Sequence, residues 1–182
     1  MSTRLAAPED WAEVPLKRIA SCPVVKDSKP DFPFIALEHI ESSTGKPVAD
    51  FDWSEPAPLD CARFRKGDVL FGKLRPYLRK YWSVDRDGCC QTELLILRAD
   101  RSKCADRFLF YLVQTEHFIA HANATSYGVK MPRTSWEAIG PFHVRIPERS
   151  SQEAISEFLD DRCAQIDEII EKKQRLIDLL AE

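Results

Sequence analysis

The feature that most restricts how this chain folds is its C-terminal stretch, residues 150–182, which contains neither glycine nor proline. The stretch opens with Ser-Ser-Gln-Glu, a capping-box pattern that predicts a helix start. Its apolar residues then recur at the three- and four-residue spacing of a coiled coil. Arg162 and Lys173 fall on the same stripe and weaken it. We therefore predict a long spacer or dimerisation helix over 150–182, joined to a separate body over 1–149.

The predicted partner-binding surface of this helix consists of leucines and isoleucines at its a, d and e positions. They are Leu159, Ile166, Ile169, Ile170, Leu176, Ile177 and Leu180. An exposed apolar stripe of this length is an association site. At 1.5 Å per residue, about thirty helical residues span on the order of 45 Å, which is more than one turn of DNA.

Residues 63–82 concentrate positive charge in a chain whose net charge is −3. They include seven lysines and arginines and one acid, Asp68, and so carry a charge of +6. The apolar run at 69–71 predicts a buried strand, and Pro76 keeps the residue before it out of helical geometry. Cations interleaved with aromatic rings suit a polyanion. A solvated edge strand blunted by lysines is an equal alternative. The candidate DNA-binding residues in this segment are Lys73, Arg75, Tyr77, Arg79 and Lys80.

A second loop, residues 123–133, combines small polar side chains with one glycine and two cations. The Thr-Ser-Trp-Glu sequence at 134–137 is a capping-box pattern and predicts a short helix closed by Gly140. Small polar groups beside cations can contact base edges, and an adjacent helix N-terminus can hold a phosphate. An ordinary surface loop is the alternative. The candidate DNA-binding residues here are Tyr127, Lys130, Arg133 and Thr134.

Composition is typical of a soluble globular protein, with 44% hydrophobic and 30% charged residues among 182. The sequence has neither a membrane-spanning stretch nor a signal-peptide pattern, so we expect a cytoplasmic protein without a membrane partner. Residues 148–182 carry a charge of −5, and subtracting this from −3 leaves +2 for residues 1–147. The charge balance therefore does not exclude nucleic acid, because clustering matters more than the total.

The residue patterns for metals, cofactors and disulfides are weak. The six cysteines are scattered and form no Cys-x-x-Cys pair, so we expect reduced thiols and no structural zinc. His117 and His121 are four residues apart on a helix predicted over 106–121, but no third ligand accompanies them. Residues 42–46 depart from a phosphate-binding loop, because Pro47 stands where serine or threonine is required. We predict no cofactor and no metal.

Four segments resemble the target-recognition domains of type I restriction–modification specificity subunits. They are Gly67–Lys80 (GDVLFGKLRPYLRK), Gly128–Arg133 (GVKMPR), the strand end Ile146–Pro147, and Gln152–Ile155 (QEAI). In the last segment the family's usual Glu-Gln order is reversed. The resemblance covers nearly the whole chain, with its parts in matching order.

This resemblance implies a non-catalytic domain that recognises one half of a bipartite double-stranded DNA target. Its implied partners are a modification subunit, which methylates adenine with S-adenosylmethionine, and a restriction subunit that cleaves. A second recognition half, or a second copy of the chain, would bind through the long helix. S-adenosylmethionine, ATP and magnesium would belong to the partner subunits. A fragment, a natural half-subunit and a truncated gene product all remain open.

The implied fold class is α+β. Buried strands are predicted at 34–37 and 94–97, and a half-buried strand at 142–146. Together with the resemblance, these elements predict a mixed, largely antiparallel twisted sheet with helices, followed by a long C-terminal coiled-coil helix.

The alternative functions are a stand-alone DNA methyltransferase or nuclease, and a truncated assembly scaffold. A methyltransferase would need an Asn-Pro-Pro-Tyr-like element and a glycine-rich cofactor loop, which the sequence lacks. Pro30-Asp31 and Glu171-x-Lys173 imitate parts of a nuclease site, but the second pair falls on the predicted long helix. A scaffold would leave the basic segment unexplained.

Overall fold

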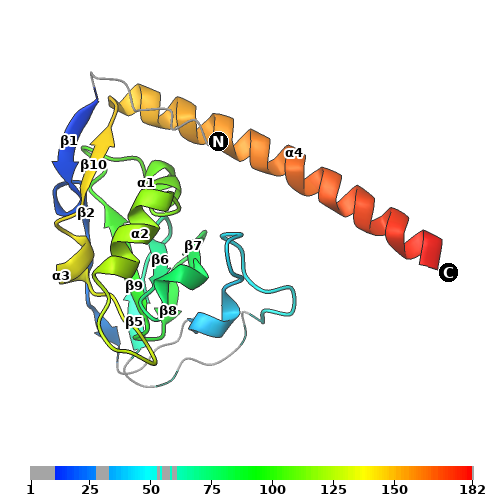
Figure 1. Ribbon diagram of the computed structural model, residues 1–182, viewed down its shortest axis with the longest axis horizontal. Coiled ribbons are helices and arrows are strands. Elements are labelled where there is room, and N and C mark those ends of the chain that lie inside the picture. The colour runs from blue at the N-terminus through cyan, green and yellow to red at the C-terminus, as the bar shows by residue number, and fades with distance from the viewer. Residues whose placement is uncertain (1–10, 28–32, 53, 55–57, 59–60, 182) are drawn as a thin grey trace.

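The computed structural model describes residues 11–27, 33–52, 54, 58 and 61–181, which form a body of sheets and helices followed by one long helix (Figure 1). Pro30-Asp31, the first part of the imitated nuclease site, lies outside the described residues. No helix in the described ranges is long and apolar enough to cross a membrane.

The described strands form three sheets. One sheet pairs β1 (Ala12–Pro15) with β10 (His143–Ile146). The second has the order β2 (Ala20–Ser21), β9 (Leu94–Ala99), β6 (Val69–Gly72) and β7 (Tyr81–Ser83). The third has the order β3 (Lys26–Asp27), β5 (Cys61–Phe64), β8 (Gly88–Cys90) and β4 (Phe34–Ile35). Only β4 and β8 are parallel among these pairings, so the predicted mixed and largely antiparallel α+β class is confirmed.

The paired strands β6 and β9 separate two hydrophobic cores. Phe71 and Leu97 face the larger core, whereas Leu70 and Ile96 face the smaller one. Side chains alternate between the two faces of a strand, so a strand buried on both faces has a continuous apolar run instead of an alternating one. This explains why the apolar run predicted at 94–97 folds as a buried strand.

The four α-helices of the described chain differ greatly in length. They are α1 (Asp106–Leu112), α2 (Glu116–Ala124), α3 (Trp136–Ile139) and α4 (Arg149–Ala181). Three short 3₁₀ turns accompany them, η1 (Leu16–Arg18), η2 (Leu37–His39) and η3 (Pro76–Leu78). The single helix predicted over 106–121 is wrong, because the helix is interrupted and restarts at α2. Thr115 caps the new start by accepting a hydrogen bond from the Phe118 N–H.

The two predicted capping boxes are each displaced. The cap of α3 is Ser135, whose side chain accepts from the Ala138 N–H, while Thr134 is buried one residue earlier. Helix α4 begins at Arg149, and the Ser150 hydroxyl donates to the Glu148 carboxylate. Gly140 ends α3 as predicted.

All six cysteines are free thiols, as predicted. Those buried in the body are Cys61, Cys89, Cys90 and Cys104. Burial raises the pKa of the Cys104 thiol to about 12, which makes it unreactive at neutral pH. Cys163 is exposed on α4.

Candidate nucleic-acid interface

The structure brings together the two loops in which the sequence predicts DNA-binding residues. Leu74 and Arg133 form an antiparallel bridge, although 59 positions separate them in the sequence. On either side of this bridge, the Arg75 N–H donates to the Pro132 carbonyl at 2.7 Å, and the Thr134 N–H donates to the Lys73 carbonyl at 3.0 Å. The chain after β6 and the loop after α2 therefore form one continuous surface. We call it the loop face and define it by Lys73, Arg75, Tyr77, Tyr127 and Lys130.

The backbone of the loop face is strained and held in place. Arg75 and Arg79 flank the turn η3 with φ angles of 50° and 53°, in the left-handed region that non-glycine residues seldom adopt. Each such residue costs about 1–2 kcal/mol. The contact of Arg75 with Pro132 supports one side of the turn, and a hydrogen bond from the Ser43 N–H to the Arg79 carbonyl supports the other. The geometry of this turn is therefore fixed by the body before any ligand binds.

Three of the predicted DNA-binding cations are engaged within the protein. Arg79 forms an ion pair with Glu116 at 2.5 Å, and Arg133 pairs with Glu93 at 3.1 Å. The Lys80 ammonium group donates to the Leu37 carbonyl at 2.9 Å. The hydrogen bond from Arg79 lowers the pKa of the Glu116 carboxyl and raises that of the guanidinium. These contacts hold the three side chains against the body, and the two arginines are paired with carboxylates.

The remaining charges lie on the loop face. Lys73 and Lys130 have no ion-pair partner among the described residues, and Lys130 is exposed. The Arg75 guanidinium donates to the Lys130 carbonyl at 3.3 Å and has no carboxylate partner within the described chain. Tyr77 and Tyr127 expose 52% and 65% of their surface. Cations and aromatic rings are thus presented side by side on a supported backbone.

The buried position of Thr134 separates it from the loop face. Only 1% of its surface is exposed, and its hydroxyl group has no hydrogen-bond partner among the described residues. A side chain at this depth has no route to a base edge without movement of the loop. Thr134 is therefore not part of the loop face.

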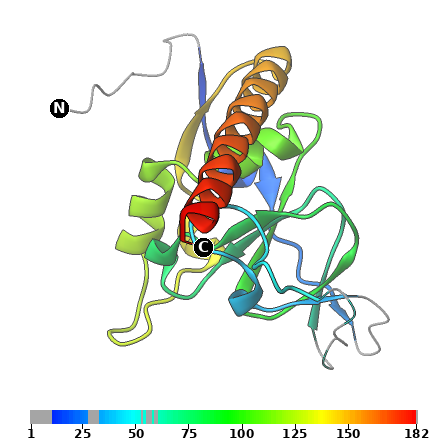
Figure 2. The same ribbon diagram turned by 90° about the vertical axis from the view of Figure 1, so that its right-hand side faces the viewer.

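Two exposed apolar residues next to the loop face were not among the predicted DNA-binding residues. Val129 is fully exposed and Met131 is 45% exposed, on either side of Lys130. Apolar side chains between a glycine and a proline were the available signal, because such flanking residues confine a segment to a turn. The loop that carries them protrudes from the body after α2 (yellow-green in Figure 2).

Helix α4 is attached to the body through its first three turns. The Gln152 side chain is fully buried, accepts from the Ala105 N–H at 2.9 Å, and donates to the carbonyls of Lys103 and Pro147. Asp160 accepts hydrogen bonds from Arg107 and Tyr111 of α1. These polar contacts fix the direction in which α4 leaves the body (Figure 1).

The rest of α4 exposes most of the apolar side chains predicted as a partner interface. Each of these side chains is more than half exposed: Ile166, Ile169, Ile170, Leu176, Ile177 and Leu180. Leu159 differs, because it is half-buried in the attached turns. An ion pair between Lys46 and Asp167 at 2.5 Å is a further contact with the body. Both side chains are largely exposed, so this pair contributes little stability.

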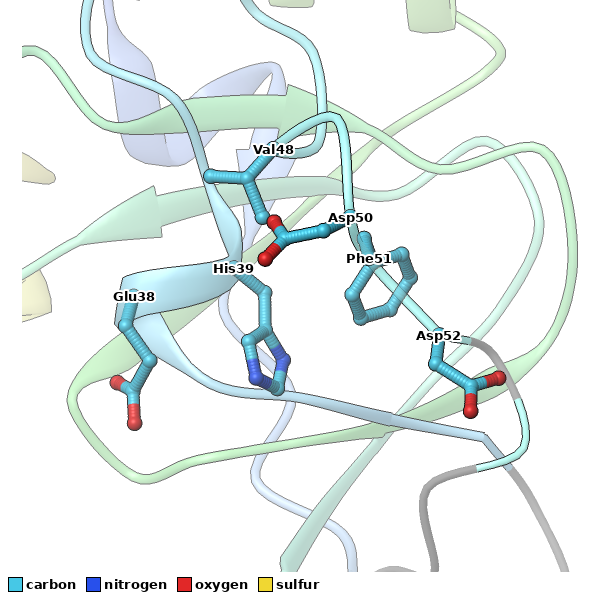
Figure 3. Close-up of a pocket in the computed structure, with 6 residues that line it drawn as sticks. All are labelled: Glu38, His39, Val48, Asp50, Phe51 and Asp52. Carbon is cyan, nitrogen blue, oxygen red and sulfur yellow. The ribbon is translucent and has the colours of Figure 1, made fainter.

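A surface pocket of about 400 Å³ is lined by acidic side chains (Figure 3). Glu38, Asp50 and Asp52 line it together with His39 and Phe51. His39 Nδ1 accepts a hydrogen bond from the Ala36 N–H, and its ring lies 5.0 Å from that of Phe51. The histidine therefore has a local structural role, and the acids make the pocket unsuitable for a phosphate.

Of the two histidines His117 and His121, the second has a structural role. His121 contacts the Ala138 carbonyl through Nε2 at 3.1 Å, and its ring lies 4.7 Å from that of Phe142. Within the described chain, no group of three or more histidine, cysteine or acidic side chains is placed to hold a metal ion.

Comparison with known proteins gives consistent relatives. The chain is 25% identical over 166 residues to the type I restriction enzyme EcoDI specificity subunit of Escherichia coli, covering 89% of this chain and 37% of that protein. No protein-family model matches. The chain spans little more than a third of the length of this curated relative.

Solved structures show the same fold. A chain from a study of complex assembly and conformational transition of the type I restriction–modification system has a TM-score of 0.74 and 23% identity, over 95% of this chain and 48% of that one. The HsdS subunit of Thermoanaerobacter tengcongensis has a TM-score of 0.73 and 23% identity, over 98% and 49%. The type I restriction–modification S subunit of M. genitalium is more distant, with a TM-score of 0.57 and 12% identity over 98% of this chain and 47% of that one.

Proposed function

Because the chain belongs to the family of type I restriction–modification specificity subunits and covers about half of one, we propose that it recognises one half of a bipartite double-stranded DNA target. In this proposal residues 1–149 form the DNA-reading body, and residues 150–182 form the helix that joins it to partners. It acts in the cytoplasm, where its DNA substrate is accessible.

The observation that carries the proposal is the convergence of two distant loops on one basic surface. The loop face presents Lys73, Arg75 and Lys130 beside Tyr77 and Tyr127. Cations at the surface attract phosphates and fix the register of a protein on duplex DNA, while side chains that reach base edges supply sequence preference. A surface supported by backbone hydrogen bonds loses little conformational freedom on binding, which favours affinity.

The roles of the loop-face residues follow from their exposure. Arg75 and Lys73 lie close to the body and suit phosphate contacts. Lys130 and Tyr127 are exposed on the loop after α2, where they can enter a groove. A lysine can donate to guanine O6 and N7, and a good bidentate base contact discriminates by about 1–3 kcal/mol.

The outer part of α4 is the proposed partner surface. Its apolar stripe fits an antiparallel helix from a second recognition half or a second copy of the chain, and the modification subunit then binds the assembly. Arg162 and Lys173 interrupt the stripe and disfavour a generic parallel pairing. A helix of this length would hold two DNA-reading bodies at a fixed separation, with unread base pairs between the half-sites.

In this proposal, other subunits carry out the catalytic steps. Specificity subunits of this family are not catalytic and carry no cofactor. The modification subunit would supply methylation with S-adenosylmethionine, and the restriction subunit would supply cleavage with ATP and magnesium. The present chain contributes the choice of sequence.

Selection of bound duplexes from a random pool, using the chain together with its modification subunit, tests this function. We expect enrichment of a bipartite motif with a spacer of fixed length. Recovery of unenriched DNA would contradict the proposal. In a second arm, the chain alone is incubated with DNA and labelled S-adenosylmethionine. Transfer of label there would favour the stand-alone methyltransferase instead.

A further inference from the structure

The tip of the protruding loop is closed by a single antiparallel bridge between Tyr127 and Arg133. The Tyr127 N–H donates to the Arg133 carbonyl at 3.0 Å, and the Arg133 N–H donates back to the Tyr127 carbonyl at 2.9 Å. Gly128 turns the chain with a φ of 93°, a conformation that side-chain-bearing residues rarely adopt. The five residues between the paired positions are therefore a closed tip on a hydrogen-bonded base.

The leading side chains of this tip are apolar and uncovered. Val129 is 100% exposed and Met131 is 45% exposed, and neither belongs to a hydrophobic core of the described chain. Because they contribute nothing to either core, the packing of the body does not account for them. Their surroundings indicate what could cover them.

The charge around the tip favours a polyanion over a protein surface of mixed charge. Lys130 lies between the two apolar residues, and the Arg75 guanidinium is hydrogen-bonded to its carbonyl. Residues 124–136 contain no acidic side chain. A partner that accepts both cations and exposed methyl groups is duplex DNA, whose major groove lies between phosphates and displays the C5-methyl group of each thymine.

We propose that Val129 and Met131 read thymine methyl groups in the major groove, an inference that rests on the proposed function. The major groove is about 12 Å wide and admits an element as broad as an α-helix or a two-stranded ribbon, so it can admit a loop closed by one bridge. The loop enters tip first, so Val129 and Met131 reach the base edges while Arg75 remains near the phosphates of the groove wall. Val129 and Met131 thus determine sequence preference, beyond the polar residues of the same loop.

The test removes one methyl group from the DNA and one side chain from the protein. The chain is assembled with its modification subunit, and its selected motif is prepared with each thymine replaced in turn by deoxyuridine. We expect one or two replacements to weaken wild-type binding by about fourfold, the value for one buried methyl group. Val129→Ala or Met131→Ala should bind thymine DNA correspondingly more weakly and lose the difference between thymine and deoxyuridine at that position.

The matched control is Val24→Ala, which truncates a valine that is 74% exposed elsewhere on the body. It should retain the full response to deoxyuridine. The inference is overturned if no thymine of the motif shows coupling to Val129 or Met131, or if the variants lose the modification subunit while still binding DNA like the wild type. A wild-type complex that selects no motif at all would instead contradict the proposed function itself, and the inference would fail with it.

Discussion

The loop face and the outer part of α4 are both exposed, yet they are built in opposite ways. The loop face presents cations and tyrosines on a backbone that hydrogen bonds tie to the body. The outer helix presents isoleucines and leucines on a backbone supported mainly by its own helical hydrogen bonds. The first surface is prepared for a charged and hydrated ligand, and the second for an apolar one. The difference fits the two separate partners proposed above, DNA and another helix.

The junction between these regions is polar where a hydrophobic contact would be the usual choice. Gln152 and Ser156 are the buried polar side chains of α4, whereas Ile155 and Leu159 are only half-buried and the other large apolar residues of α4 are exposed. A buried amide with three hydrogen bonds fixes orientation more strictly than an apolar contact, because its donors and acceptors must be matched. The junction therefore sets the direction of the outer helix relative to the loop face.

The largest effect should come from placing charge on the outer helix. The double substitution Ile166→Asp and Ile169→Asp should weaken association with a second helix more than about a hundredfold, because each isoleucine contributes about 1.5–3 kcal/mol when buried. The free energy of unfolding of the isolated chain should change little, since both residues are more than half exposed. Sedimentation at micromolar concentration measures the association.

Glu168→Ala is the matched control on the same turn, where Glu168 pairs only with Lys172. A wild-type chain that stays monomeric and does not bind the modification subunit would contradict the role of the outer helix as a partner surface. This result would not test the proposed binding of DNA by the loop face.

The junction gives the next largest effect. Gln152→Leu removes the partners of the Ala105 N–H and of the Lys103 and Pro147 carbonyls, and should destabilise the chain by about 3 kcal/mol. Gln174→Leu, on the exposed outer helix, should change the free energy of unfolding by less than about 0.5 kcal/mol. Urea unfolding compares the two variants, and equal destabilisation would show that α4 is not anchored at Gln152.

Two lysines allow a comparison between a cation that can contact a phosphate and one that a hydrogen bond holds against the body. Lys73→Ala should lower the slope of log K against log salt by about one, because the proposed phosphate contact of Lys73 is lost. Lys80→Ala should change the slope less, because its half-buried ammonium group keeps its charge but is held against the body by the hydrogen bond to the Leu37 carbonyl, and it should also lower thermal stability. Titration of duplex binding over a range of salt concentrations measures both. Equal slopes for the two variants would contradict the assignment.

The smallest effect concerns pH at the junction. Burial acts to raise the pKa of the Asp160 carboxyl, but hydrogen bonds from Arg107 and Tyr111 outweigh it and hold the pKa below its ordinary value of 3.8. The stabilisation is therefore present above about pH 4 and is lost as the pH falls through the lowered pKa.

Because the Arg107 and Asp160 side chains are 42% and 40% exposed, solvent screening limits this contribution to less than about 1 kcal/mol. Asp160→Asn should remove the pH dependence, and the exposed neighbour Asp161→Asn should not. Unfolding curves at pH 3 to 6, taken as a range about the ordinary carboxyl pKa, provide the measurement. Parallel curves for Asp160→Asn and the wild type would refute the assignment.

The elements that the sequence predicted well are those whose signal is local and repeated. The glycine- and proline-free pattern of α4 and the apolar runs of β6 and β9 depend on neighbouring residues alone. The break between α1 and α2 was missed because apolar residues continue in register across it, whereas Thr115 acts through a single hydrogen bond.

Ion-pair partners were not predictable for a similar reason. Nothing in the sequence links Arg79 to Glu116 or Arg133 to Glu93. Both arginines were therefore predicted as DNA-binding residues, and in the structure each forms an ion pair with a glutamate. The sequence also did not predict that Val129 is exposed at the tip of a loop, because a single apolar residue in a loop belongs to no periodic pattern.

The most direct test of the account is motif selection by the assembled complex carrying Tyr127→Ala together with Lys130→Ala. Both side chains are exposed on the protruding loop, so the body and the outer helix should remain intact. We predict that base preference relaxes in the half-site contacted by this chain, by about 1–3 kcal/mol at the affected position, while the spacer length is unchanged. An identical motif from the variant and the wild type would contradict the claim that the loop face reads DNA.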